Sequence, residues 1–168
     1  MSEATATEQQ QPVFNIEKLY VKDLSLEIPH APGIFLEIEN PHVDLQMHTQ
    51  VTAIEDGLYE ITLTVTVTSQ IAAKDKVVFL IEAKQSGIFQ VRNMPPQELE
   101  PVLWVICPNI LYPYLREVVS NMAVRAGFAP VLLNPVNFDV LYQQQREQAA
   151  ADAAAATAAA EATPVTTH

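Results

Sequence analysis

An apolar stretch punctuated by proline and asparagine, residues 107–142, most constrains what this chain can fold into. Within it, adjacent apolar pairs recur every four residues over 110–126, a spacing that predicts one helix with a wide apolar stripe. Asn109 is expected to cap the start of that helix, Pro113 to occupy its first turn, and Gly127 to end it. The stretch holds no nucleophile beside a base, metal cluster or phosphate loop, so it indicates association rather than catalysis.

The residues before this stretch alternate as β-strands do. From Leu58 to Gln70, apolar side chains alternate with glutamate and threonine, which predicts a half-buried strand of an antiparallel sheet. Runs at 43–48 and 77–84 predict two more strands, the second continuing to residue 89, and a first strand is expected over 16–28. Strands first and helices after is the order of an α+β domain, with helices packed on one face of a four-stranded antiparallel sheet.

The remaining elements and boundaries follow from turn and composition signals. A hairpin turn is expected at 55–57, a short helix over 97–106, and a last helix starting near residue 136 or 137. Residues 1–12 are polar and Gln-rich and are expected to be disordered, and 13–148 form the folded domain. The alanine-rich residues 149–168 are expected to be a fraying helix that becomes a mobile tail.

Charge and cysteine usage limit the partners. Acidic residues outnumber basic ones by 20 to 9, a net charge of −11, which argues against nucleic acid and anionic membranes. The single cysteine, Cys107, excludes an internal disulfide. The first residues lack the apolar core of a secretory signal, and no uncharged apolar run reaches membrane-spanning length. We therefore expect a cytoplasmic protein that does not insert directly into membranes.

One face of the expected sheet is acidic and polar. Tyr20 is expected to share the opposite, apolar face with Leu24 and Leu26. A flat acidic face with one leucine could dock a basic segment or could be an ordinary solvated face, and alternation leaves both interpretations open. The side chains expected on it are Asp23, Ser25, Glu27, Thr62, Thr64, Thr66, Leu80 and Glu82.

The helical stripe over 110–126 is wider than one sheet face requires. It could be core, but burial between subunits explains both apolar flanks more economically. The residues expected at an oligomer interface are Ile110, Tyr114, Leu115, Val118, Val119 and Met122.

The sequence gives little support for an enzyme, a metal site or a cofactor. Its 4 histidines do not have metal-ligand spacing with cysteine or paired carboxylates. Cys107 precedes a proline near a helix start, where a thiolate could be stabilised, but its apolar surroundings favour a buried structural cysteine.

Several sequence blocks in a fixed order, from about residue 13 to 145, carry a resemblance. They are Tyr20-Val-Lys-Asp-Leu-Ser-Leu-Glu27 followed by Pro29 and Ala31-Pro32; Tyr59-Glu60 before the Thr/Val strand; Phe79-Leu-Ile-Glu82 leading to Gly87-Ile-Phe89; Cys107-Pro-Asn-Ile-Leu-Tyr-Pro-Tyr114 with Arg116-Glu117; and Pro135-Val-Asn-Phe-Asp139. In these blocks the chain resembles SecB, the bacterial protein-export chaperone family.

The resemblance implies both a function and an assembly. SecB-like proteins are holdases that bind unfolded preproteins without ATP and deliver them to the SecA motor, and they assemble as a homotetramer, a dimer of dimers with helices between the dimers. A chaperone dedicated to a toxin–antitoxin system is the alternative within the same resemblance. No cofactor is implied, because the zinc of this system belongs to the basic C-terminal tail of SecA.

The resemblance also implies two sets of binding residues. The positions that contact SecA fall on Asp23, Glu27, Leu80 and Glu82. The groove that holds the client polypeptide lies between the segment after the first strand and the last helix, which suggests Phe35, Leu36, Ile38, Phe138, Leu141 and Tyr142.

Overall fold

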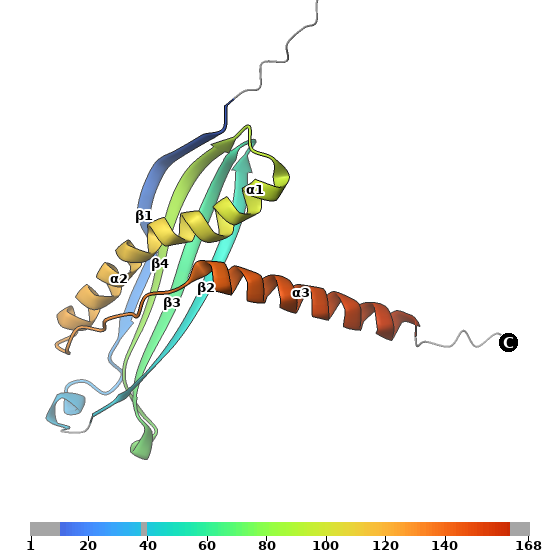
Figure 1. Cartoon of the computed structure of the whole chain (residues 1–168). Helices are drawn as coiled ribbons and strands as arrows, with labels where there is room; N and C mark the ends of the chain where they lie inside the picture. Colours follow the sequence, from blue (N-terminus) through green and yellow to red (C-terminus); the bar gives the residue numbers. More distant parts are fainter. Residues whose placement is uncertain (1–10, 38–39, 162–168) are drawn as a thin grey trace, which may run out of the picture. The chain divides into compact units, whose positions relative to one another are not determined.

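The computed structural model describes residues 11–37 and 40–161 of the chain. The chain divides between Asn134 and Pro135 into two compact units. The first unit contains the sheet and a long helix, and the second contains the last helix (Figure 1). Most of the segment predicted to be disordered, residues 1–10, lies outside the described residues.

Four antiparallel strands form one sheet in the order β1-β4-β3-β2. They are β1 (Val13–Glu27), β2 (His42–Glu55), β3 (Leu58–Ile71) and β4 (Lys76–Arg92). A 3-10 turn, Gly33–Leu36, lies between β1 and β2, and Gly57 takes a φ of 70° in the tight turn between β2 and β3. The predicted four-stranded antiparallel sheet is therefore confirmed, with β1 and β2 as its edges.

β1 contains two bulges, at Glu17 and at Lys22, where its pairing register with β4 shifts. Each extra residue reverses the face to which the following side chains point. Tyr20 pairs with Ser86 and so lies on the solvent face, whereas Leu24 lies on the face that meets the helices. The predicted grouping of Tyr20 with Leu24 is wrong for this reason, since a strict period of two does not anticipate a bulge.

A long helical segment follows the sheet. It consists of α1 (Pro96–Pro101), a π-helical turn (Val102–Ile106) and α2 (Cys107–Arg125), which continue into one another. The expected helix start at Asn109 is wrong, and Pro113 lies inside α2 rather than in a first turn.

The π-helical turn lies between two prolines that lack an N–H donor, Pro101 and Pro108. Within it the Cys107 N–H reaches back five residues to the carbonyl of Val102. Asn109 caps nothing: its side-chain amide donates to the Val105 carbonyl one turn earlier, at 2.9 Å. The π-helical turn therefore keeps the helical segment continuous where the prolines and the asparagine suggested a break.

The end of α2 is as predicted. Gly127 has a φ of 86° and follows the last helical residues. The Gly127 N–H donates to the Val124 carbonyl at 3.0 Å, and the Phe128 N–H donates to the Ala123 carbonyl at 3.1 Å. This pair of bonds is a Schellman motif, which requires the left-handed backbone that glycine adopts readily.

The core lies between α2 and the face of the sheet that meets it, called here the helix face. α2 packs on β3 and β4, and the alternating residues from Ile61 to Val67 are fully buried beneath it (Figure 1). Gly87 allows the close approach, because a Cβ there would lie 3.0 Å from the Leu111 side chain and 2.7 Å from the Phe89 ring. Helices on one face of the sheet are thus confirmed for this unit.

The second unit is the helix α3 (Phe138–Glu161) with the residues that lead into it. The Asn137 side chain accepts a hydrogen bond from the Val140 N–H at 3.2 Å, as expected for a helix that starts there. α3 continues through the alanine-rich segment to residue 161. The end of the expected mobile tail, residues 162–168, lies outside the described residues.

Candidate functional site

The wide apolar stripe of α2 is divided between two environments. Leu115 and Val119 are fully buried within the chain, where α2 packs on the sheet. Their placement in an oligomer interface is wrong, because the chain's own sheet already covers them. The other predicted interface residues stay at least partly exposed: Ile110, Tyr114, Val118 and Met122.

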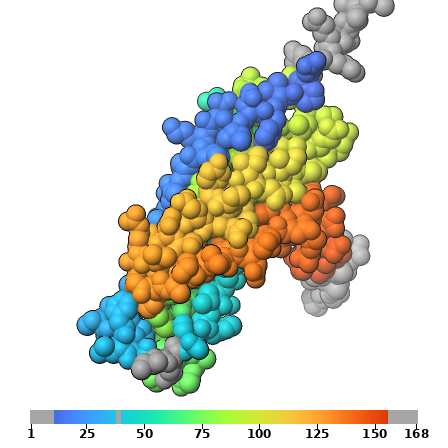
Figure 2. Space-filling model, turned by 60° about the vertical axis from the view of Figure 1, so that its left-hand side comes forward, coloured from blue at the N-terminus to red at the C-terminus, as the bar shows by residue number. Residues whose placement is uncertain are grey.

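The edge strand β1 lies beside this exposed stripe. Figure 2 shows β1 (blue) next to the outer surface of α2 (yellow to orange), both open to solvent on this side. A long edge strand presents unpaired main-chain donors and acceptors that can pair with another chain. The apolar side chains that β1 leaves exposed are Phe14, Ile16, Val21 and Leu24.

The solvent face of β1 and β4 carries the residues predicted to contact SecA. In the strand register Glu27 pairs with Leu80, and Glu82 pairs with Ser25, next to Asp23 along β1. Asp23 and Glu82 side chains are 57% and 40% exposed. The structure therefore brings the four predicted residues together on one surface, called here the acidic surface: Asp23, Glu27, Leu80 and Glu82.

Lys84 is a member of this surface that sequence reasoning did not place there. It pairs with Asp23 across the strands, and its Nζ lies 3.7 Å from Asp23 Oδ2 and 3.5 Å from Glu82 Oε1. The alternation that puts Glu82 on this face also puts Lys84 there, two residues later. Because the groups are well exposed, each ion pair contributes little to stability, and the surface keeps an excess of carboxylates.

Farther along the same face, a hydrogen-bonded cluster replaces exposed charge. Glu60 accepts hydrogen bonds from the Tyr20 hydroxyl and from Lys22 Nζ, the latter at 2.8 Å. Lys22, and after it Tyr20, hold the pKa of Glu60 below its usual value, while burial and Glu60 raise the pKa of Tyr20 to about 12. Thr62, which was expected on the exposed acidic face, is buried and shares a 2.8 Å hydrogen bond with Ser86. This part of the face is structural.

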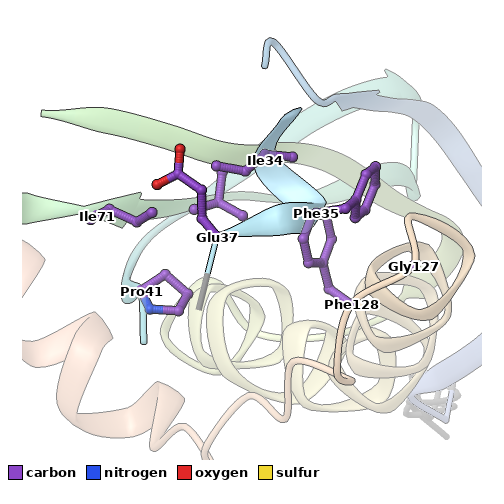
Figure 3. Close-up of a pocket in the computed structure, with 8 residues that line it drawn as sticks. Ile34, Phe35, Glu37, Pro41, Ile71, Gly127 and Phe128 are labelled. Carbon is purple, nitrogen blue, oxygen red and sulfur yellow. The ribbon is translucent and has the colours of Figure 1, made fainter. Parts of the chain in front are cut away.

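On the helix face, two adjoining pockets form an apolar groove within the first unit. One, of about 210 Å³, lies at Ile34, Phe35 and Ile71, and the other, of about 430 Å³, lies at Val43, Ser69, Phe79 and residues 129–132. Both are lined by Pro41 and Phe128, which join them. Figure 3 shows Phe35 and Phe128 side by side at the first pocket.

Phe128 is the centre of this groove. Its ring centroid lies 5.2 Å from that of Phe35 and 4.9 Å from that of Phe79, within the range of favourable aromatic contacts. Gly127 leaves the space, since a Cβ there would lie 3.3 Å from the Phe35 ring. Sequence reasoning did not assign Phe128, yet its position directly after a helix-ending glycine was a usable signal, because that residue commonly packs back onto the structure.

Ion pairs fasten one end of the groove. Glu37, which lines the first pocket, accepts hydrogen bonds from Lys76 and Lys74, the latter at 2.9 Å. The bonds from Lys76 and then Lys74 lower the pKa of Glu37 to about 2. This cluster ties the segment that carries Phe35 to the turn between β3 and β4.

The residues predicted to hold a client polypeptide have different outcomes. Phe35 lines the apolar groove, and Leu36 beside it is 84% exposed. Ile38 lies outside the described residues. The other three lie in the first turns of α3, in the second unit: Phe138, Leu141 and Tyr142.

Cys107 is a structural residue. Its side chain is fully buried at the start of α2. Burial raises the pKa of its thiol to about 12, so the thiolate that a nucleophile requires is not formed near neutral pH. This supports the expected buried cysteine over the alternative of a reactive one.

Comparison with known proteins assigns the chain to a family. A family model for SecB, the preprotein translocase subunit, matches residues 7–149. The chain belongs to the SecB family. It is 61% identical to the protein-export protein SecB of Nitrosomonas eutropha over 84% of this chain and 88% of the relative. It is 56% identical to that of Methylobacillus flagellatus over 99% of this chain and 98% of the relative.

A solved SecB-like chaperone supports the fold independently. The chaperone from Mycobacterium tuberculosis, solved with a peptide from the HigA1 antitoxin, has a TM-score of 0.60 and 18% identity, covering 74% of this chain and 91% of that chain. The predicted membership of the SecB family and the predicted SecB-like fold are therefore confirmed.

The family also bears on the predicted activity. Many relatives named as protein-export proteins confirm the expected export chaperone, and a toxin–antitoxin chaperone is not favoured. The SecB family is a chaperone family and not an enzyme class. Among the helices that the structure describes, none has the length and apolar character needed to span a bilayer.

Proposed function

We propose that this SecB-family chain holds unfolded preproteins in the cytoplasm and passes them to SecA, using the apolar groove for the client and the acidic surface for the motor. The observation that carries the proposal is the placement of these two surfaces on opposite faces of one sheet. Thr68 and Leu80 pair at the acidic surface, and the next row, Ser69 and Phe79, lines the groove. Client and motor could therefore be bound at the same time by the same end of the sheet.

The groove suits an extended, unfolded client. Apart from Glu37 at one end, its walls are mainly aromatic and aliphatic, which gives binding with low sequence specificity. Phe35 is 49% exposed, Val43 41% and Leu132 75%, so apolar area is available for burial against a bound chain. Binding of unfolded chains alone shifts the client away from the folded state by mass action, and nucleotide is not required.

The acidic surface suits a basic partner. Glu27 pairs with Leu80 across the strands, and Glu82 and Asp23 follow along the same face, so a basic segment with one apolar contact would complement this surface. We assign this partner as the zinc-bearing C-terminal tail of SecA, so the metal is carried by the partner.

A charge reversal tests this assignment. Glu82→Lys should reduce binding of the SecA tail by at least about tenfold, because it replaces attraction with repulsion at the centre of the surface. Glu98→Lys is the matched control, since it makes the same charge change at an exposed position of α1. Titration calorimetry with the tail, and a client-aggregation assay on both variants, check the result. Equal tail binding by the two variants would refute the assignment, and loss of client protection by Glu82→Lys would show that the two surfaces are not separate.

The proposed assembly is a homotetramer formed as a dimer of dimers. The edge strand β1 offers main-chain pairing, and the outer stripe of α2 offers an apolar surface beside it. Two different surfaces of one chain are what a dimer of dimers requires, since each can form its own twofold contact.

A further inference from the structure

The pairing of β1 with β4 decides which face of the sheet Asp23 occupies. In the strand register Tyr20 pairs with Ser86, and Asp23 pairs with Lys84. Between them, Lys22 is the extra residue of a bulge. Residues an odd number apart on a regular strand point to opposite faces, so Tyr20 and Asp23 share the solvent face only because of this bulge. The acidic surface therefore depends on where along β1 the bulge lies.

A side-chain cluster binds the bulge residue from two strands away. Lys22 Nζ donates to both carboxylate oxygens of Glu60, at 2.9 and 2.8 Å, and the Tyr20 hydroxyl donates to one of the same oxygens. Glu60 belongs to β3, and β4 lies between β3 and β1. Only 15% of the Glu60 side chain is exposed, and this shielding from water strengthens the bonds. One carboxylate thus holds Tyr20 and Lys22 across β4.

A shift of the bulge by two residues would turn Asp23 away from the solvent face. With Leu24 as the extra residue, Asp23 would point to the helix face and Lys22 would pair with Lys84. Only residues 22–24 would change their positions, so this rearrangement costs less than a slip of the whole strand. It would move Lys22 away from Glu60 and place it opposite another lysine, where like charges repel. The cluster therefore favours the position that the bulge now has.

We propose that Tyr20, Lys22 and Glu60 are positioning residues for the acidic surface, which hold the bulge at Lys22 and thereby keep Asp23 available to a basic partner. This rests on the proposed binding of the SecA tail at that surface. The cluster acts through Asp23 and does not contact the partner itself. It therefore extends the determinants of motor binding beyond the residues whose charge attracts the tail.

Two substitutions with opposite effects on charge separate positioning from simple electrostatics. Lys22→Met removes a positive charge and Glu60→Gln removes a negative one, so attraction alone would strengthen tail binding in the first variant and weaken it in the second. Loss of the bulge position should instead weaken binding in both variants, by about two- to fivefold, because affinity falls with the fraction of chains that present Asp23 correctly. Titration calorimetry of the full-length protein with the SecA tail measures the change.

A double-mutant cycle tests whether the cluster acts through Asp23. In an Asp23→Asn background, Lys22→Met should cause no further loss of tail affinity, because the carboxylate that the cluster positions is already absent. Hydrogen exchange gives a second measurement that does not involve the partner. Exchange at the amides of residues 21–25 should accelerate in Lys22→Met, while exchange in β2, at the other edge of the sheet, should stay unchanged.

Lys18→Met is the matched control, since it removes the same charge from an exposed position on the same face of β1. It should leave tail affinity unchanged or slightly higher, and every variant should protect an aggregating client as the parent does. Tail binding by Lys22→Met that equals or exceeds the parent's overturns the positioning role while leaving the acidic surface intact. Losses that add to that of Asp23→Asn, or unchanged hydrogen exchange at residues 21–25, also overturn it. Failure of the parent to bind the tail overturns the acidic surface itself, and the positioning role with it.

Discussion

The two sides of helix α2 carry similar residues in different surroundings. In each adjacent apolar pair along the helix, the second residue faces the sheet and the first faces outward. Leu115 and Val119 are 0% exposed, whereas Tyr114 is 47% exposed and Val118 is partly exposed. Adjacent residues on a helix point about 100° apart, so a single sheet cannot cover both members of a pair. The inner stripe thus belongs to the core of the single chain, and the outer stripe remains available for contact with another subunit.

This difference shows how one helix can contribute both to the core of its own chain and to a contact between subunits. Apolar surface is stabilised by burial at roughly 25 cal/mol per Å², whichever surface covers it. The inner stripe gains that stabilisation within the chain, and we expect the outer stripe to gain it from other subunits. Substitutions on the two sides should therefore have separable consequences, one on folding and one on assembly.

The largest expected effect is on the inner stripe. Leu115→Ala removes a fully buried side chain from the contact with the sheet, and it should lower the free energy of unfolding by about 2–5 kcal/mol. Urea unfolding followed by circular dichroism measures this. The outward neighbour Tyr114→Ala is the matched control, measured at a protein concentration low enough to dissociate the assembly, where it should change unfolding by less than about 1 kcal/mol. Similar losses for both variants would contradict the division of α2 into two sides.

The next effect is on assembly. Val118→Asp places a charge on the outer stripe, and a charge without a partner in a subunit contact is strongly unfavourable. The proposed tetramer should therefore dissociate, while the circular dichroism spectrum is retained. Native mass spectrometry measures the assembly. Val124→Asp makes the same change at an exposed valine of the same helix that lies off the stripe, and it should leave the assembly intact. A Val118→Asp protein that remains tetrameric would exclude the outer stripe as the contact between subunits.

The sequence predicted the helices and strands of this molecule better than the contacts between them. Strand alternation located the acidic surface, because Glu27, Leu80 and Glu82 lie in regular stretches where a period of two holds. It failed for Tyr20, because the bulge at Lys22 depends on pairing with β4 and not on local pattern. It placed Leu115 in the wrong layer, because hydropathy shows that a residue is buried without showing what covers it.

The groove shows the same limit. Phe35 was predicted from the family resemblance, but Phe128 and Ser69 come from segments far apart in the sequence and meet only when α2 ends on the sheet. Local signals marked the end of α2 at Gly127, but not the partners that Phe128 finds there. Long-range packing of this kind has no signature within a single window of sequence.

The last expected effect, which is absent at neutral pH, concerns Cys107 at the inner start of α2. Burial raises the pKa of its thiol from 9.0 to about 12, so the folded protein retains the proton more strongly than the unfolded chain does. The resulting stability is complete below about pH 9 and is lost as the pH rises toward about 12, at roughly 1 kcal/mol per pH unit. Cys107→Ala should reduce this loss, measured as a shallower fall of the free energy of unfolding between pH 9 and pH 11 than in the parent.

In the parent at pH 8, iodoacetamide should label the thiol only as fast as the chain unfolds, since neither solvent nor reagent reaches it in the folded state. Rapid labelling of the folded protein would instead place Cys107 with the outer residues of α2, and the division between its two sides would no longer begin at the first turn of the helix.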